Sequence, residues 1–325
     1  MAGRAPADVT RPATAAVGEP AILAEGLTRA FGGVRALQGL DLSAPAGRVV
    51  ALVGPNGAGK TTLLLILAGL LAPDSGRVRV AGGDPLADPL AVRRAVGWMP
   101  DFFGVYEGLT AQEYLELFGA AYRLPRAERP GRARELLAGV GLEDRAGARI
   151  DTLSRGQKQR LGFVRAIVHR PSVLLLDEPA SGLDPRARVE LRDQLRAQAA
   201  GGACVLVSSH ILSELEEVAD AAVFMEAGRA TGEYAVGEPS TAASSQPWIL
   251  RALDHDALTR GLEAAGLVAR PAGPGEIEVD LAGEEAAAEL IARLVGAGVR
   301  LVEASPRRGG LERAFLGSGE QQRAR

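Results

Sequence analysis

The sequence has few of the residues that build disulfide frameworks or structural zinc sites. Its 325 residues include one cysteine, Cys204, and three histidines. A single thiol cannot form an internal disulfide, and a structural zinc ion usually needs four cysteine or histidine ligands. We therefore expect a chain that is stabilised by a hydrophobic core and is suited to a reducing compartment, the cytoplasm.

Long apolar runs are also lacking. The longest, 63–72, has ten residues and contains Gly69, whereas crossing a bilayer takes about 18 to 20 apolar residues. Residues 1–19 carry charges among Ala, Pro and Thr, so they do not have the apolar centre of a secretion signal. The sequence predicts no transmembrane helix, and it predicts a disordered tail at 1–19.

A surplus of positive charge is absent as well. Lys and Arg number 37 against 40 Asp and Glu, which gives a formal net charge of −3. Without an overall basic field, nucleic acid is not an expected partner. Only Lys60 and Lys158 are lysines, and the other basic residues are arginines. Each lysine is therefore a candidate for a specific chemical role.

Five short apolar runs alternate with helical segments between Ala21 and Met225. Because polar residues do not interrupt them, they predict parallel strands that are buried on both faces of a sheet. The segment from 110 to about 148 predicts a helical insertion that is broken at Pro125 and Pro130. The five runs are Val49–Val53, Val96–Met99, Val173–Leu176, Cys204–Val207 and Ala221–Met225.

The C-terminal part of the chain predicts a separate unit. Residues 236–247 collect Ser, Pro, Gly and Ala without hydrophobic periodicity, as is typical of a linker. Residues 248–318 predict a small βαββαβ sandwich, followed by a tail at 319–325. Its expected elements are strand Trp248–Leu253, helix His255–Gly266, strands Leu267–Arg270 and Glu276–Leu281, helix Glu284–Gly296 and strand Val299–Glu303.

Strand Glu276–Leu281 alternates acidic and apolar residues, so we expect Glu276, Glu278 and Asp280 on a face that water covers. The C-terminal unit has no clustered nucleophile, metal-ligand set or glycine-rich phosphate loop. We therefore interpret it as a docking or dimerisation module rather than a catalytic one.

A glycine-rich loop with the pattern G-x-x-x-x-G-K-T follows the first apolar run and leads into a helix expected at Leu63–Leu71. In this context backbone N–H groups surround the β-phosphate of a nucleotide, Lys60 bridges the β- and γ-phosphates, and the Thr61 hydroxyl ligates Mg²⁺. The pattern therefore predicts binding of ATP with Mg²⁺. The candidate nucleotide-binding residues are Gly54, Pro55, Asn56, Gly57, Ala58, Gly59, Lys60, Thr61 and Thr62.

Two adjacent carboxylates, Asp177 and Glu178, close the apolar run Val173–Leu176. Neighbouring side chains of a strand point to opposite faces, so the two can do different work. Asp177 is expected to hold Mg²⁺, and Glu178 to orient and deprotonate an attacking water. A plain strand end or helix cap is the alternative interpretation, but a nearby phosphate loop favours hydrolysis.

A third pattern, Leu153-Ser154-Arg155-Gly156-Gln157, lies between these two sites and precedes a helix. With it, residues of about 20–235 resemble the nucleotide-binding subunit of an ATP-binding cassette (ABC) transporter, whose signature is L-S-G-G-Q. Further landmarks of that family follow in order. They are Phe31 for adenine stacking, Ser181 to Asp184 as the D-loop, and His210 as the switch histidine.

The resemblance implies an α/β fold of the P-loop NTPase class. Its RecA-like core would carry an N-terminal antiparallel β-subdomain and a helical subdomain at about 103–150, with the C-terminal α+β domain added. Two subunits would form a head-to-tail homodimer, in which the signature of one closes over the ATP of the other through Ser154, Arg155, Gly156 and Gln157. His210 would contact the γ-phosphate from its own subunit and help to place the water near Glu178.

Two residues depart from the family pattern. Asp101 stands where the family usually has glutamine, and we expect it to reach Mg²⁺ directly or through water, with altered metal affinity. Arg155 replaces the first signature glycine, and its side chain would be constrained if the position required a positive φ. Neither change removes a group that hydrolysis needs, so slow or partner-dependent turnover is the expected consequence.

Aromatic residues are few, but seven of the 13 lie within 98–122. Tyr114, Phe118 and Tyr122 have helical spacing, which fits either the core of the insert or a contact surface. The aromatics of the preceding loop, Phe102, Phe103 and Tyr106, favour a groove for a hydrophobic element of another protein. In the family, this region docks a cytoplasmic helix of the membrane permease. The seven are Trp98, Phe102, Phe103, Tyr106, Tyr114, Phe118 and Tyr122.

These features predict an ATPase that drives a separately encoded membrane permease from the cytoplasmic face of the plasma membrane. The C-terminal extension resembles that of ATPases from bacterial exporters, which favours export. Two alternatives stay open at this point. One is a soluble ABC-type ATPase of translation or DNA repair, and the other is a nucleotide switch with little hydrolysis.

Overall fold

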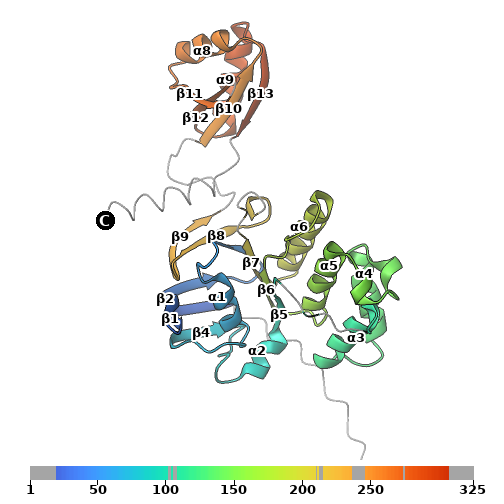
Figure 1. Cartoon of the computed structure of the whole chain (residues 1–325). Coiled ribbons are helices and arrows are strands. Elements are labelled where there is room, and N and C mark those ends of the chain that lie inside the picture. Colours follow the sequence, from blue (N-terminus) through green and yellow to red (C-terminus); the bar gives the residue numbers. More distant parts are fainter. Residues whose placement is uncertain are drawn as a thin grey trace, which may run out of the picture. The chain divides into compact units, whose positions relative to one another are not determined.

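The computed structural model describes residues 20–101, 104, 108–209, 211, 215–235, 246–273 and 275–306. They fall into two compact units, one ending at Ala235 and one within 236–314. Figure 1 shows the elements of each unit, coloured along the sequence. We describe the two units separately.

A six-stranded sheet forms the centre of the first unit, in the order β5-β6-β7-β3-β8-β9. The first five strands of that order pair in parallel, as predicted, and β9 adds an antiparallel edge strand that the apolar runs do not predict. Every residue of β3, β6 and β7 is buried. The bounds are β3 (Val49–Val53), β5 (Val96–Met99), β6 (Val173–Asp177), β7 (Cys204–Ser209), β8 (Ala221–Glu226) and β9 (Arg229–Ala235).

A second, three-stranded antiparallel sheet has the order β2-β1-β4, with β1 (Ile22–Phe31), β2 (Val34–Ala44) and β4 (Ser75–Val80). Helix α1 (Lys60–Leu67) begins three residues before the predicted helix and ends four residues earlier. Its buried leucines share one hydrophobic cluster with side chains of both sheets. The helix that follows the glycine-rich loop is thereby held from two sides.

The helical insertion contains α3 (Ala111–Ala121) and α4 (Arg129–Gly139), followed by two 3₁₀ turns, Glu143–Arg145 and Ile150–Thr152. Pro125 lies between the two helices, as expected, but the predicted break at Pro130 is wrong. Pro130 occupies the first turn of α4, where a missing N–H costs no hydrogen bond.

Two further helices follow the insertion. α5 (Arg155–Ala166) begins directly after Ser154, and α6 (Pro185–Ala200) packs against β7 and β3. A short helix, α2 (Pro89–Ala95), precedes β5. Figure 1 shows α5 beside α6 on one side and the insertion on the other.

The second unit has the predicted βαββαβ order. Its four-stranded sheet is antiparallel, with strand order β11-β12-β10-β13, and both helices contribute to its core. The bounds are β10 (Gln246–Ala252), α8 (His255–Ala264), β11 (Arg270–Gly273), β12 (Glu276–Leu281), α9 (Glu284–Gly296) and β13 (Leu301–Pro306). Two predicted strands start too early, since Leu267 and Val299 both precede the observed pairing.

The expectation of a fully wet acidic face on β12 is wrong at Glu278, which is only 8% exposed. Its register partner on β11 is Arg270, whose guanidinium lies 3.7 Å from the Glu278 carboxylate and 3.0 Å from that of Asp280. The long arginine side chain covers the carboxylate, which alternation of residue types along one strand could not predict.

No helix in the described part of the chain combines the length and the apolar character needed to cross a bilayer. Cys204 begins β7 and is buried, and this burial raises the pKa of its thiol to about 12.

Candidate nucleotide-binding and hydrolysis site

The glycine-rich loop joins β3 to α1, and close backbone contacts require glycine at two of its positions, Gly54 and Gly59. A Cβ on Gly54 would lie 2.3 Å from the carbonyl oxygen of Met225, and one on Gly59 would lie 2.4 Å from that of Ala36. Gly59 also has a φ of 102°, which side chains rarely tolerate. The loop therefore has a fixed backbone at the start of α1, where N–H groups favour anions.

Lys60 is the first residue of α1 and is only 7% exposed. Its Nζ donates hydrogen bonds to the carbonyls of Gly54 at 2.6 Å and Pro55 at 3.3 Å, so the side chain curls back over its own loop. Burial lowers the pKa of Lys60, and the carboxylates of Glu178 and Asp177 act in the opposite direction. The ammonium is thus held beside the position that phosphates would take.

Thr61 and Asp177 meet although 116 positions separate them in the sequence. The Thr61 hydroxyl donates to Oδ2 of Asp177 at 2.7 Å, and the Ser208 hydroxyl donates to Oδ1 at 2.6 Å. Asp177 is 3% exposed. Ser208 had no predicted role, yet it is the register partner of Asp177 across the β6–β7 pair.

This oxygen set fits Mg²⁺, which takes one or two protein oxygens together with phosphate oxygens and water. Among the described residues, no three His, Cys, Asp or Glu side chains gather into an all-protein metal site. The Thr61 hydroxyl and the Asp177 carboxylate therefore suit a metal ion that arrives with a nucleotide.

Glu178 directly follows β6 and has a φ of 49°, a left-handed backbone that is unusual for a residue with a side chain. Its N–H donates to the carbonyl of Ser208 at 3.2 Å and to the Ser208 hydroxyl at 3.1 Å. The left-handed φ and these two hydrogen bonds fix the backbone of the turn that follows β6.

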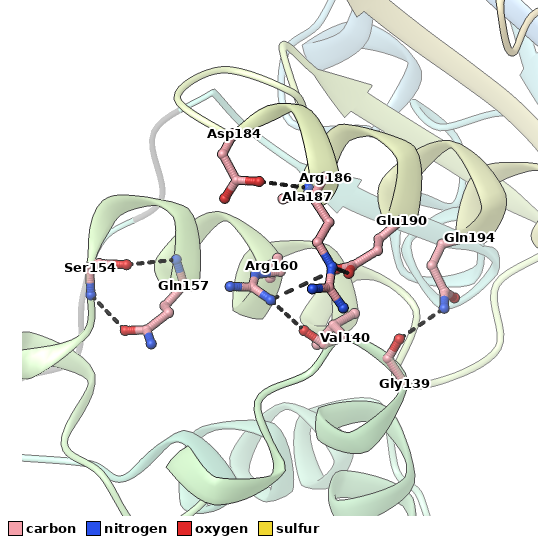
Figure 2. Close-up of polar contacts among 10 residues, drawn as sticks. All are labelled: Gly139, Val140, Ser154, Gln157, Arg160, Asp184, Arg186, Ala187, Glu190 and Gln194. Atoms are coloured by element: carbon pink, nitrogen blue, oxygen red, sulfur yellow. Dashed lines mark hydrogen bonds and ion pairs between the residues drawn. The ribbon is translucent and has the colours of Figure 1, made fainter.

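Residues 153–157, which carry the signature pattern, lead into the start of α5, as Figure 2 shows, and we call them the signature turn. The Ser154 hydroxyl accepts from the Gln157 N–H at 3.2 Å, and the Gln157 side chain accepts from the Ser154 N–H at 2.9 Å. This reciprocal pair is a capping box. Gly156 lies between them in the first turn and keeps its N–H at the helix end.

Arg155 is the first residue of α5 and does not have a positive φ. The constraint considered for a side chain at this position is therefore absent in this structure. The guanidinium of Arg155 donates to the Ser181 hydroxyl at 3.0 Å, and this contact joins the signature turn to the D-loop of the same chain.

Asp184 caps the N-terminus of α6 by accepting from the Ala187 N–H at 2.9 Å, as Figure 2 also shows. This hydrogen bond is the main reason that the pKa of Asp184 is lowered. Leu183, just before it, is buried. The D-loop therefore passes directly into a helix whose first turn is fixed.

Phe31 and Asp101, predicted for adenine stacking and for Mg²⁺, lie at the surface of the chain. Phe31 is 47% exposed at the end of β1, and the Arg29 guanidinium lies 4.8 Å from the centre of its ring. Asp101 is exposed just after β5. Four residues fall outside the described part of the chain: Phe102, Phe103, Tyr106 and His210.

The described aromatics of the insertion contribute mainly to its core. Tyr114 is fully buried, with the Phe118 ring 4.9 Å away. Tyr122 stacks on His169 at 3.6 Å. His169 lies after α5, its ring contacts the backbone carbonyl of Val96 at 3.1 Å, and burial lowers its pKa to about 4.

Comparison with known proteins places this geometry in context. Residues 37–181 match the family described as ABC transporter. The chain is 40% identical over 253 residues to the daunorubicin/doxorubicin resistance ATP-binding protein of Streptomyces peucetius, which covers 78% of this chain and 76% of that protein. It is 37% identical over 229 residues to the Nod factor export ATP-binding protein I of Paraburkholderia xenovorans, covering 70% and 74% of the two.

Solved structures show the same fold. An ATP-binding subunit of an ABC transporter has a TM-score of 0.63 at 28% identity, covering 84% of this chain and 99% of that one. A dimeric bacterial ABC transporter cassette has a TM-score of 0.62 at 28% identity, covering 66% and 98%. These likenesses confirm the predicted fold class.

Proposed function

The chain belongs to the ABC transporter family of ATP-binding proteins, and on that premise we propose that it hydrolyses ATP to drive export through a separate membrane permease. The observation that carries the proposal is the grouping of Lys60, Thr61, Asp177 and Glu178 around one helix start. Relatives named for drug resistance and for Nod factor export support the direction of transport. They also favour it over a role in translation or DNA repair.

ATP binding begins with an exchange of partners at Lys60. The carbonyls of Gly54 and Pro55 hold its Nζ in the free protein. Phosphate oxygens are stronger acceptors because they are charged, so the ammonium would move from these carbonyls onto the β- and γ-phosphates. Thr61 and Asp177 would hold Mg²⁺, which supplies positive charge to neutralise the phosphates during transfer.

Hydrolysis requires a base for the attacking water, and Glu178 is the residue we assign to it. Its backbone is fixed by the two hydrogen bonds from its N–H to Ser208. A fixed backbone limits where the carboxylate can reach, which is what placing a water in line with the γ-phosphate demands. His210 would act beside it.

The second half of the site would come from another copy of the chain. Ser154 and the N–H of Gly156 lie at the start of α5, where the helix dipole favours the γ-phosphate of a partner's ATP. A solved dimeric cassette with the same fold supports this arrangement. Closure on ATP and opening after hydrolysis would then move the permease, with the subunit bound at the cytoplasmic face of the membrane.

The test has two parts. Purified protein should release phosphate from ATP, whereas a Lys60→Ala variant should not. Tagged Glu178→Gln protein, captured with ATP from detergent-solubilised membranes of the host, should bring with it a protein with several membrane spans. Phosphate release no faster than that of Lys60→Ala would refute the enzymatic part, and capture of ribosomal or repair proteins alone would refute the transport part.

A further inference from the structure

The carbonyl side of the Glu178 backbone is held as firmly as its N–H side. The Gln159 side-chain amide donates to the carbonyl of Glu178 at 3.2 Å and to that of Pro179 at 3.0 Å. The Ser181 N–H also donates to the Glu178 carbonyl, at 3.1 Å. With Ser208 on the other side, the residue assigned as the base is held between β7 and α5.

Gln159 is well suited to this contact. It lies in α5, one helical turn beyond Arg155, and is only 6% exposed. A buried primary amide has two N–H groups, and here two backbone carbonyls receive them. Removing the donor would take this hydrogen bond from the buried Pro179 carbonyl and leave the Glu178 carbonyl with only the Ser181 N–H, which favours a shift of the backbone.

The backbone at Glu178 needs such support. A φ of 49° is unfavourable for a residue with a Cβ and persists only where the surroundings determine it. Relaxing the turn would rotate the Cα–Cβ bond of Glu178 and carry its carboxylate away from the water. Hydrolysis is sensitive to such a shift, because a displacement of about 1 Å can cost roughly 100-fold in rate.

We propose that Gln159 is a positioning residue, through which the signature helix of each subunit sets the carboxylate of that subunit's own Glu178. This rests on the proposed function. The start of α5 faces the partner's ATP, whereas Gln159 one turn later holds the base for the subunit's own ATP. One helix therefore contributes to both composite sites of the dimer. When its start binds the γ-phosphate of the partner's ATP, the position of its own subunit's Glu178 changes as well.

The first test removes the donor while keeping the side-chain length. Gln159→Met and Gln159→Glu should each lower kcat by about 10- to 100-fold, with KM for ATP and the affinity for a fluorescent ATP analogue changed less than about threefold. The second variant preserves volume and has no N–H to donate, and the first, which is uncharged, serves if the second folds poorly.

The chain offers a matched control at Gln194, shown in Figure 2. Its side-chain amide donates to the carbonyl of Gly139 at 3.0 Å and ties α6 to the end of α4. Gln194→Met thus removes the same kind of contact between helices without affecting Glu178. It should keep kcat within about twofold of the wild type.

Mixed dimers separate positioning from a general effect on α5. Differently tagged subunits are co-expressed and purified through both tags, with one subunit carrying Glu178→Gln so that a single site remains active. Gln159→Met placed in the subunit that keeps Glu178 should slow this site. Placed instead in the Glu178→Gln subunit, whose signature faces the active site, it should leave the rate within about twofold.

The reverse pattern, with the slow rate only when Gln159→Met lies in the Glu178→Gln subunit, would overturn the proposal by assigning Gln159 to the signature. Equal kcat for wild type, Gln159→Met and Gln159→Glu would also overturn it. Failure of the proposed function looks different, because the wild type itself would then release no more phosphate than Lys60→Ala.

Discussion

The composite site has two halves, and each lies at the start of a helix. The buried half is the phosphate loop with the carboxylates that end β6, and it is complete in a single chain. The exposed half is the signature turn, which is not complete without a partner. Lys60 and Asp177 are nearly inaccessible to solvent, and their hydrogen bonds go to the loop with the start of α1 and to β7. Ser154 and Arg155 are exposed, and Ser154 satisfies its polar groups within its own turn. Buried polar groups need internal partners, whereas an exposed helix start can exchange its own cap for an incoming anion.

The largest effect should follow from removing the base. Glu178→Gln should lower turnover by about 1,000-fold, because general-base catalysis typically supplies 10²- to 10⁴-fold. Nucleotide binding should persist, so ATP should accumulate in a closed dimer. Light scattering with saturating ATP and Mg²⁺ would measure this, and a variant that stayed monomeric would contradict the composite site.

In the buried half of the site, Lys60→Ala should weaken the binding of ATP. The variant loses the only described ammonium in the loop, and we expect the ATP affinity to fall by about 100-fold, as for loss of a buried charge pair with phosphate worth roughly 3 kcal/mol. Titration with a fluorescent ATP analogue would measure this. Retention of wild-type affinity would remove Lys60 from the phosphate site.

Ser154→Ala tests the exposed half. In the Glu178→Gln background, it should weaken ATP-driven dimerisation by about tenfold, the value of one hydrogen bond to a charged group. The ATP affinity of a single subunit should not change. If that affinity fell to the same extent, the two halves would not be separable.

Thr110→Ala provides the control for lost helix capping. Thr110 caps α3 with a capping box of the same kind, formed with Glu113, and removing such a cap costs about 1 kcal/mol. The midpoint of thermal unfolding should therefore fall by a similar amount in Thr110→Ala and Ser154→Ala, whereas only Ser154→Ala should weaken dimerisation.

The smallest effect is expected at Asp101, which is exposed just after β5. Asp101→Gln restores the amide usual at this position, so ATP affinity should stay within about threefold. Turnover in the presence of the permease should change instead. A complete loss of ATP binding would make Asp101 a primary Mg²⁺ ligand and would assign it to the buried half.

The buried half could be predicted because its chemistry is local. The loop from Gly54 to Lys60 and the carboxylates that end β6 each lie within one short segment, next to a strand that an uninterrupted apolar run identifies. The contacts of Ser208 and Gln159 could not be predicted in the same way. They depend on which strand pairs with β6 and on which face of α5 meets the turn after it.

In the fold, as in the site, the features that depend on one short segment were predictable. Apolar runs located the buried strands of the central sheet, since burial on both faces leaves a continuous signal in the sequence. The errors occurred where a neighbour changes the meaning of a residue. Arg270 from the next strand covers Glu278, and the turn that precedes α4 makes Pro130 a helix start.

The single thiol of the chain has a practical consequence. With its pKa raised to about 12 inside β7, Cys204 is a thiolate in roughly one molecule in 100,000 at neutral pH. Maleimide reagents, which react with thiolates, should therefore leave Cys204 unmodified in the folded protein. A spectroscopic probe can then be attached to one introduced cysteine on an otherwise native chain, and the approach of two signature turns can be followed as a distance in time.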